Sequence, residues 1–152
     1  GVNLQATTCV ELAEHPNIIA VKEASGNLQQ IMEILRDKPS DFDVLSGDDG
    51  ITQPMMALGA KGVISVAANG YPDLFCKMVK SMMNQDNGTA LSLHYKTLKM
   101  NNLIFADGNP AGIKCLMAYR NLCKNILRLP LVPVNEDVKR NIENEFETIY
   151  NK

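Results

Sequence analysis

Lys22 is the residue whose position most directly suggests chemistry. It closes an apolar run at residues 17–21, and the polar, turn-forming residues 23–27 follow at once. Five mostly β-branched or small residues between turn signals predict a strand that is buried on both faces. A lysine half-buried at the end of such a strand would have a lowered pKa, because burial disfavours the charged ammonium. Its free amine could then condense with a carbonyl to form a Schiff base. The alternative is a lysine whose stem packs on the strand end while its head stays in water.

The elements that would position Lys22 alternate along the first half of the chain. Periodicity and turn signals predict helices at 6–15, 28–37, 51–59 and 71–83, and strands at 18–22, 43–46 and 62–67. Thr7 or Thr8 is expected to cap the first helix, and Asn27 the second. Regular alternation with short connections predicts a parallel sheet built from strand–helix–strand crossovers.

The second half of the chain has helical periodicity only. Helices are predicted at 89–106, 110–124 and 135–150, with an extended connector at 129–133. Three parallel strands leave two sheet edges without partners. The sequence therefore predicts either a small open α/β domain with covered edges or part of a barrel whose other strands lie elsewhere.

Composition narrows the class of protein. The net charge is −2 and the basic residues are spread along the 152-residue chain, which argues against nucleic-acid binding. We find neither a run of about 18 apolar residues nor a signal-peptide pattern, so no membrane association is expected. The four cysteines form no CxxC pair, so neither a zinc site nor a disulfide framework is indicated, and a cytoplasmic setting is expected. No metal and no cofactor is predicted.

Five segments of the chain, in order, resemble one enzyme family. They are similar to the C-terminal half of the dihydrodipicolinate synthases, which belong to a superfamily of pyruvate-dependent class I lyases and aldolases that includes N-acetylneuraminate lyase. The Glu-Ala-Ser that follows the lysine favours the synthases. The matching segments are VKEASG at 21–26, LSGDD at 45–49, LGAKGVISV at 58–66, GNP at 108–110 and LRLPL at 127–131.

The resemblance implies a fold. It predicts an α/β chain that is the C-terminal part of a TIM (β/α)8 barrel, strands six to eight, followed by a three-helix C-terminal extension. Residues 1–87 would form the partial barrel and residues 88–152 the extension. Gly1 matches the end of a strand-five loop of the family, so we expect a fragment. The family's substrate-binding arginine, catalytic tyrosine, proton-relaying threonines and regulatory lysine site would then lie upstream.

The resemblance also implies a reaction. Lys22 matches the lysine that forms an imine with pyruvate, and the derived enamine attacks aspartate-4-semialdehyde in the diaminopimelate route of lysine biosynthesis. Gly47 and Ile64 match positions that border the pyruvate pocket, although ordinary turn and core roles would explain them equally well. Members of the family commonly form homotetramers. The chain by itself is expected to be inactive, because it lacks the proton relay and the carboxylate anchor.

Two other interpretations stay open. A sister lyase or aldolase acting on N-acetylneuraminate or a 2-keto-3-deoxy sugar acid would use the same lysine. Alternatively, the chain is a non-catalytic half-barrel that needs a complementary chain to cover its sheet edges. The pair Asp48 and Asp49 is expected to cap helical turns rather than to act in acid–base chemistry, and Glu23 should point to the strand face opposite Lys22.

Overall fold

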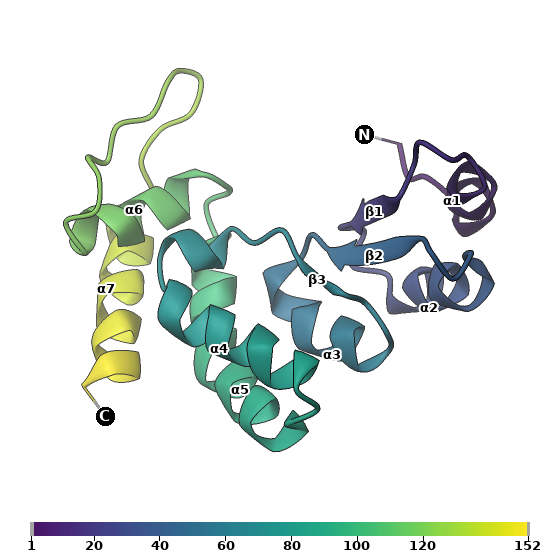
Figure 1. Cartoon of the computed structure of the whole chain (residues 1–152). Helices are drawn as coiled ribbons and strands as arrows, with labels where there is room; N and C mark the ends of the chain where they lie inside the picture. The colour runs from purple at the N-terminus through teal and green to yellow at the C-terminus, as the bar shows by residue number, and fades with distance from the viewer. Residues whose placement is uncertain (1, 152) are drawn as a thin grey trace.

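The computed structural model describes residues 2–151. The first part alternates helices, short 3-10 turns (η) and strands: α1 (Ala6–Ala13), β1 (Ala20–Glu23), α2 (Leu28–Asp37), β2 (Asp43–Ser46), η1 (Asp49–Ile51), α3 (Thr52–Ala57) and β3 (Gly62–Val63). The remainder is helical: η2 (Ala67–Asn69), α4 (Pro72–Met83), α5 (Asn87–Leu103), α6 (Ala111–Tyr119) and α7 (Glu136–Tyr150). Figure 1 shows the sheet and α1 and α2 at one end of the molecule and α6 and α7 at the other.

The three strands form the parallel sheet that the alternation predicted, and their order in it is β1-β2-β3. Strand β2 and helix α2 have the predicted bounds. The Asn27 side chain caps α2 by accepting hydrogen bonds from the backbone N–H groups of Gln29 and Gln30. These local signals were sufficient because turn chemistry and capping act over a few residues.

The two faces of the sheet differ. Val44 on β2 is fully buried and packs in a core with Ile31 and Ile34 of α2. The opposite face is left open by the described residues, and on it Lys22 is exposed. Near the start of β1, Ile19 is 74% exposed. The expectation of a strand buried on both faces is therefore wrong for this chain, because helices cover only one side of the sheet.

The ends of several predicted elements are also wrong. Strand β3 ends at Val63 instead of residue 67, because Asp49 binds the N–H groups of Val66 and Ala67 and the chain turns there into η2. Helix α1 begins at Ala6 as predicted, but it ends at Ala13 instead of residue 15, and neither Thr7 nor Thr8 caps it. Helix α6 ends at Tyr119 instead of residue 124, since the backbone soon turns left-handed at Asn121 (φ 59°).

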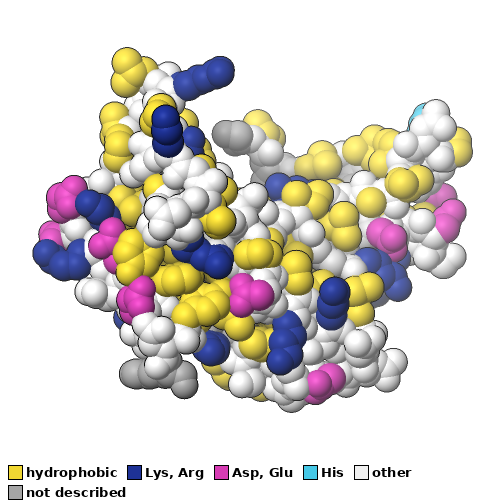
Figure 2. All heavy atoms as spheres, turned by 60° about the vertical axis from the view of Figure 1, so that its left-hand side comes forward, with side chains coloured by type: hydrophobic (Ala, Val, Ile, Leu, Met, Phe, Trp, Pro, Cys, Tyr) yellow, Lys and Arg dark blue, Asp and Glu magenta, His cyan; other side chains and the backbone are white. Residues whose placement is uncertain are grey.

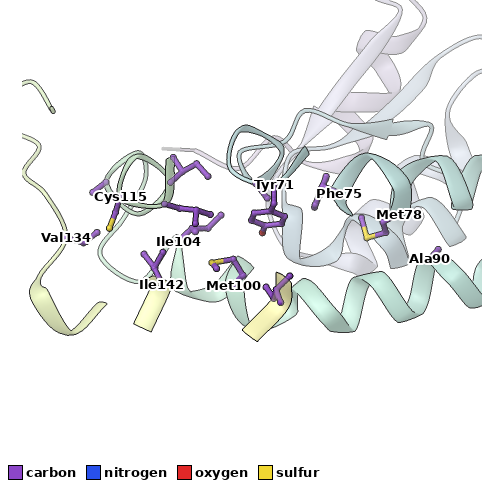
Figure 3. Packing of buried hydrophobic residues seen from close by; sticks show 14 residues of the cluster. Tyr71, Phe75, Met78, Ala90, Met100, Ile104, Cys115, Val134 and Ile142 are labelled. Atoms are coloured by element: carbon purple, nitrogen blue, oxygen red, sulfur yellow. The ribbon is translucent and has the colours of Figure 1, made fainter. Parts of the chain in front are cut away.

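The helical part has its own core. Figure 3 shows buried side chains of α4, α5, α6 and α7 packed together, with Tyr71 between Phe75 on one side and Met100 and Ile104 on the other. The aromatic rings of Tyr71 and Phe75 meet edge to face at 6.4 Å, an arrangement that favours aromatic pairs. Helix α4 thus packs chiefly with the helices that follow it in sequence.

The connector between α6 and α7 projects from the body of the molecule (Figure 1). It contains no helix or strand, as predicted for its middle part at 129–133. Several of its apolar side chains are exposed, with Leu129 at 87% and Ile126 at 64%.

Candidate active site

Lys22 lies near the carboxyl end of β1, on the open face of the sheet. It pairs in register with Leu45 of β2, which pairs with Gly62 of β3. The half-buried position expected from the sequence is not found, because this face has no cover among the described residues and Lys22 is exposed. The expected strand end itself is confirmed within one residue, since β1 extends to Glu23.

Gly47 lies directly beside Lys22. It follows β2, and its backbone N–H donates a 2.7 Å hydrogen bond to the carbonyl of Glu23. A Cβ atom added at Gly47 would lie 2.7 Å from Cε of Lys22. Two positions that the sequence singled out separately are therefore brought together by strand pairing.

Ile64 comes directly after β3 and is 51% exposed. Its backbone N–H donates to the carbonyl of Ser46 at 2.9 Å, which extends the strand ladder by one residue. Because Gly62 pairs with Leu45 and alternate residues share a face, Ile64 falls on the same open face as Lys22. All three candidate residues thus lie on one face of the sheet.

Glu23 points to the opposite, buried face, as alternation predicted. Its carboxylate accepts hydrogen bonds from the Ser25 N–H at 3.2 and 3.3 Å and from the Gln30 amide at 3.3 Å. Gln30 in turn pairs reciprocally with the amide of Asn3. Burial, and then the Glu23 carboxylate, raise the pKa of the neighbouring Cys9 thiol. This network connects the end of β1 to the segment before α1. The sequence alone did not indicate it, because its members are up to 27 residues apart.

The two adjacent aspartates cap turns, as expected. Asp48 accepts a hydrogen bond from the N–H of Gly50 at the start of η1. Asp49 is 2% exposed and caps η2 by accepting hydrogen bonds from the N–H groups of Val66 (3.0 Å) and Ala67 (2.8 Å).

Burial, together with the charge of Asp49, raises the pKa of Tyr71 far above its usual range, so this phenol is a neutral donor. It donates to the side-chain oxygen of Asn101 on α5.

Two cavities flank the end of β1. One, of about 390 Å³, contains Lys22 and is bounded by residues 2–4 and Cys9. The other, of about 420 Å³, is lined by Gly47 and Asp48, by Asn101 of α5 and by Phe105, which follows α5. The sequence did not indicate this contribution of α5, since nothing local links residue 47 to residue 101.

Among residues 2–151, no three His, Cys, Asp or Glu side chains are arranged to hold a metal ion. None of the helices described there is both long and apolar enough to cross a bilayer.

The sequence of the chain is similar to proteins of one enzyme family. A sequence model of the dihydrodipicolinate synthetase family matches residues 1–149. The chain is 50% identical over 134 residues to 4-hydroxy-tetrahydrodipicolinate synthase of Phocaeicola vulgatus, covering 88% of this chain and 45% of that protein. It is 48% identical, with the same coverage, to the synthase of Parabacteroides distasonis. The chain thus spans about half the length of the curated relatives it matches.

Solved structures agree in fold. Dihydrodipicolinate synthase from Aquifex aeolicus matches with a TM-score of 0.90 and 36% identity, covering 97% of this chain and 50% of that one. The synthase from Thermotoga maritima has a TM-score of 0.95 at 28% identity, covering 98% and 52%. A protein described as a monomeric dihydrodipicolinate synthase variant matches at 0.95 and 28%, with 98% and 51% covered. The mixed α/β structure is that of a TIM-barrel enzyme family, and the chain belongs to the dihydrodipicolinate synthetase family.

Proposed function

We propose that the chain is the C-terminal part of a pyruvate-condensing synthase. In this proposal β1, β2 and β3 are strands six to eight of a (β/α)8 barrel, and α5, α6 and α7 are a three-helix C-terminal extension. Residues 1–87 belong to the barrel and residues 88–152 to the extension. The parallel strand order and the purely helical second half support this division, and so does the half-length match to the synthases.

Lys22 is the proposed nucleophile. Its amine attacks the keto carbon of pyruvate, and water leaves as the imine forms. Loss of a methyl proton gives the enamine, whose carbon attacks the aldehyde carbon of aspartate-4-semialdehyde. The observation that carries this proposal is the position of Lys22 at the carboxyl end of a parallel strand, on the open face of the sheet. Enzymes with (β/α)8 barrels place their active sites at that end of the strands.

Gly47 and Ile64 are proposed to border the pyruvate. Both lie on the face of the sheet that carries Lys22, by register and by alternation. A sister lyase for sugar acids would use the same lysine, and the names of the relatives reported above favour the synthase.

Exposed apolar side chains support the proposal that further strands complete the barrel. Beside β3, a groove of about 450 Å³ is lined by Leu45, Val63, Val79 and Met83, and Met83 is 66% exposed. On the face shown in Figure 2, the molecule is hollowed between the projecting connector and the N-terminal part, and apolar side chains lie on both sides of the hollow. Apolar surface of this kind indicates an interface. We therefore propose that residues 1–152 alone are inactive and require the other half of the barrel.

The assembly of the whole protein stays a prediction. The family resemblance predicts a homotetramer, whereas one structural relative is a monomeric variant. The cytoplasmic setting also stays a prediction.

Borohydride trapping tests the proposed chemistry. The longer protein, which is the complete synthase of which this chain is the proposed C-terminal part, is incubated with pyruvate and borohydride. It should gain the mass of a reduced pyruvyl adduct on the peptide that contains Lys22. Lys22→Arg should abolish the adduct. Lys61→Arg is the matched control, because Lys61 is an exposed lysine that precedes β3 at the opposite end of the sheet. An adduct on another lysine, or none in the unaltered protein, would overturn the proposal.

A further inference from the structure

We propose that Gly47 is a positioning residue for Lys22: the absence of a side chain at residue 47 leaves the space that the lysine stem occupies. The inference rests on the proposed function, in which Lys22 is the nucleophile. Gly47 then has two roles: it leaves space for the stem of Lys22, and it borders the substrate.

Steric contact is the first observation. A Cβ atom at residue 47 would lie 2.7 Å from Cε and 3.1 Å from Cγ of Lys22, and 2.7 Å from Cβ of Ala24. Contacts below 3.0 Å are essentially never made by real Cβ atoms, so a side chain at residue 47 would force a neighbour to move.

Backbone conformation does not require glycine at this position. The residues with positive φ are Gly26, Gly59 and Gly108 among the glycines, and Gly47 is not one of them. Since L-amino acids can adopt its conformation, the requirement for glycine is one of space.

The backbone on both sides of the contact is held in place. The N–H of Gly47 bonds to the carbonyl of Glu23, and the buried Glu23 carboxylate bonds to the N–H of Ser25. At the contact with Lys22 the flexible lysine stem is therefore the partner that gives way, whereas the contact with Cβ of Ala24 can be relieved only by a shift of backbone. Because Cε carries the reactive nitrogen, moving Cε moves the amine.

Gly62 provides a matched comparison. It pairs with Leu45 on the neighbouring strand, in the same row of the sheet as Lys22. A Cβ atom there would meet only Cδ2 of Leu45, at the ordinary distance of 3.7 Å. The two glycines thus differ in their contacts with Lys22 and with Ala24, and a variant at Ala24 separates the two contacts.

The test uses the longer protein and measures the rate of borohydride trapping by pyruvate at Lys22. Gly47→Ala should slow trapping by roughly 10²-fold, the effect of misplacing a reacting group by about 1 Å. Gly62→Ala should trap at the unaltered rate. The double variant Ala24→Gly/Gly47→Ala should stay slow, because removing the contact with Ala24 leaves the contact with Lys22. Trapping by Gly47→Ala at the unaltered rate, or recovery in the double variant, would overturn the inference.

A second measurement does not depend on catalysis. In the Ala24→Gly background, Gly47→Ala should lower the urea midpoint of unfolding when Lys22 is present and leave it unchanged when Lys22 is replaced by alanine. Equal effects in the two backgrounds would overturn the inference. If the unaltered protein fails to trap pyruvate, the proposed function fails, and this thermodynamic cycle still decides whether Gly47 accommodates Lys22.

Discussion

The sheet region (residues 2–66) and the helical region (residues 67–151) bury their apolar side chains in different ways. In the sheet region, helices cover one face, and the core includes Val44, Ile31 and Met55. In the helical region, four helices enclose a core that extends from Ala67 to Ile149 (Figure 3). The proposed catalytic lysine lies on the uncovered face of the sheet region. The helical region thus contains the larger buried core, whereas the sheet region contains the proposed nucleophile.

The two regions meet at the candidate site. Asp49 of the sheet region caps η2 of the helical region, and α5 forms a wall of the cavity next to Gly47. Stability in the helical region should therefore affect the geometry of the site, whereas truncating an exposed side chain on the open sheet face should barely affect stability. Four predictions sharpen or break this contrast.

The largest expected effect is the loss of a buried aromatic side chain. Phe75→Ala should lower the free energy of unfolding of the chain by about 3–5 kcal/mol, because it leaves a cavity in the helical core. Ile64→Ala on the open sheet face should cost less than about 1 kcal/mol, since the side chain is already half exposed. Urea denaturation measures both. Equal losses of unfolding free energy in the two variants would show that Phe75 and Ile64 contribute equally to stability, and the contrast between the regions would then be wrong.

Close helix packing should give the next effect. A Cβ atom at Gly112 on α6 would lie 2.1 Å from the backbone oxygen of Ile104. Gly112→Ala should cost about 3 kcal/mol, because backbone must shift to accept it. Gly62→Ala in the sheet region is the control, with an expected change within about 0.5 kcal/mol. A stable Gly112→Ala variant would contradict the close approach of α5 and α6.

A buried hydrogen bond should contribute less. Tyr71→Phe removes the donor to Asn101 and leaves a buried oxygen unpaired, so it should cost about 1–2 kcal/mol. Tyr95→Phe, at a tyrosine that is 64% exposed, should change the thermal midpoint little. If the two variants unfold at the same temperature, the bond to Asn101 does not stabilise the fold.

The smallest effect concerns pH. Burial lowers the pKa of His94 on α5 below its ordinary 6.5. The folded state therefore binds fewer protons than the unfolded state, so the stabilising contribution is complete above pH 6.5 and is lost as the pH falls toward the lower, folded-state pKa. His94→Leu should lose less stability than the unaltered chain between pH 7.5 and pH 5.5, measured by urea denaturation. An identical pH dependence would show that His94 does not contribute.

Local signals in the sequence were sufficient for much of the fold. The alternation of apolar runs predicted three parallel strands, and α2 with its Asn27 cap was predicted to the residue. The end of β3 was not predictable, because it depends on hydrogen bonds from Val66 and Ala67 to Asp49, which lies 17 residues earlier. The expected burial of β1 was wrong for a related reason, since burial depends on what covers a strand.

For the site, the sequence by itself determined the residue types: a lysine closing one strand, a glycine following the next, and an isoleucine in the predicted third strand. Only the tertiary structure decided that Lys22 and Gly47 touch, that Ile64 shares their face, and that α5 walls the neighbouring cavity. The physical reason is the separation of the interacting residues along the sequence. Strand and helix propensities are set by neighbours a few residues away, whereas contacts between strands and between regions are made by residues 25 to 54 positions apart, whose meeting no local pattern encodes.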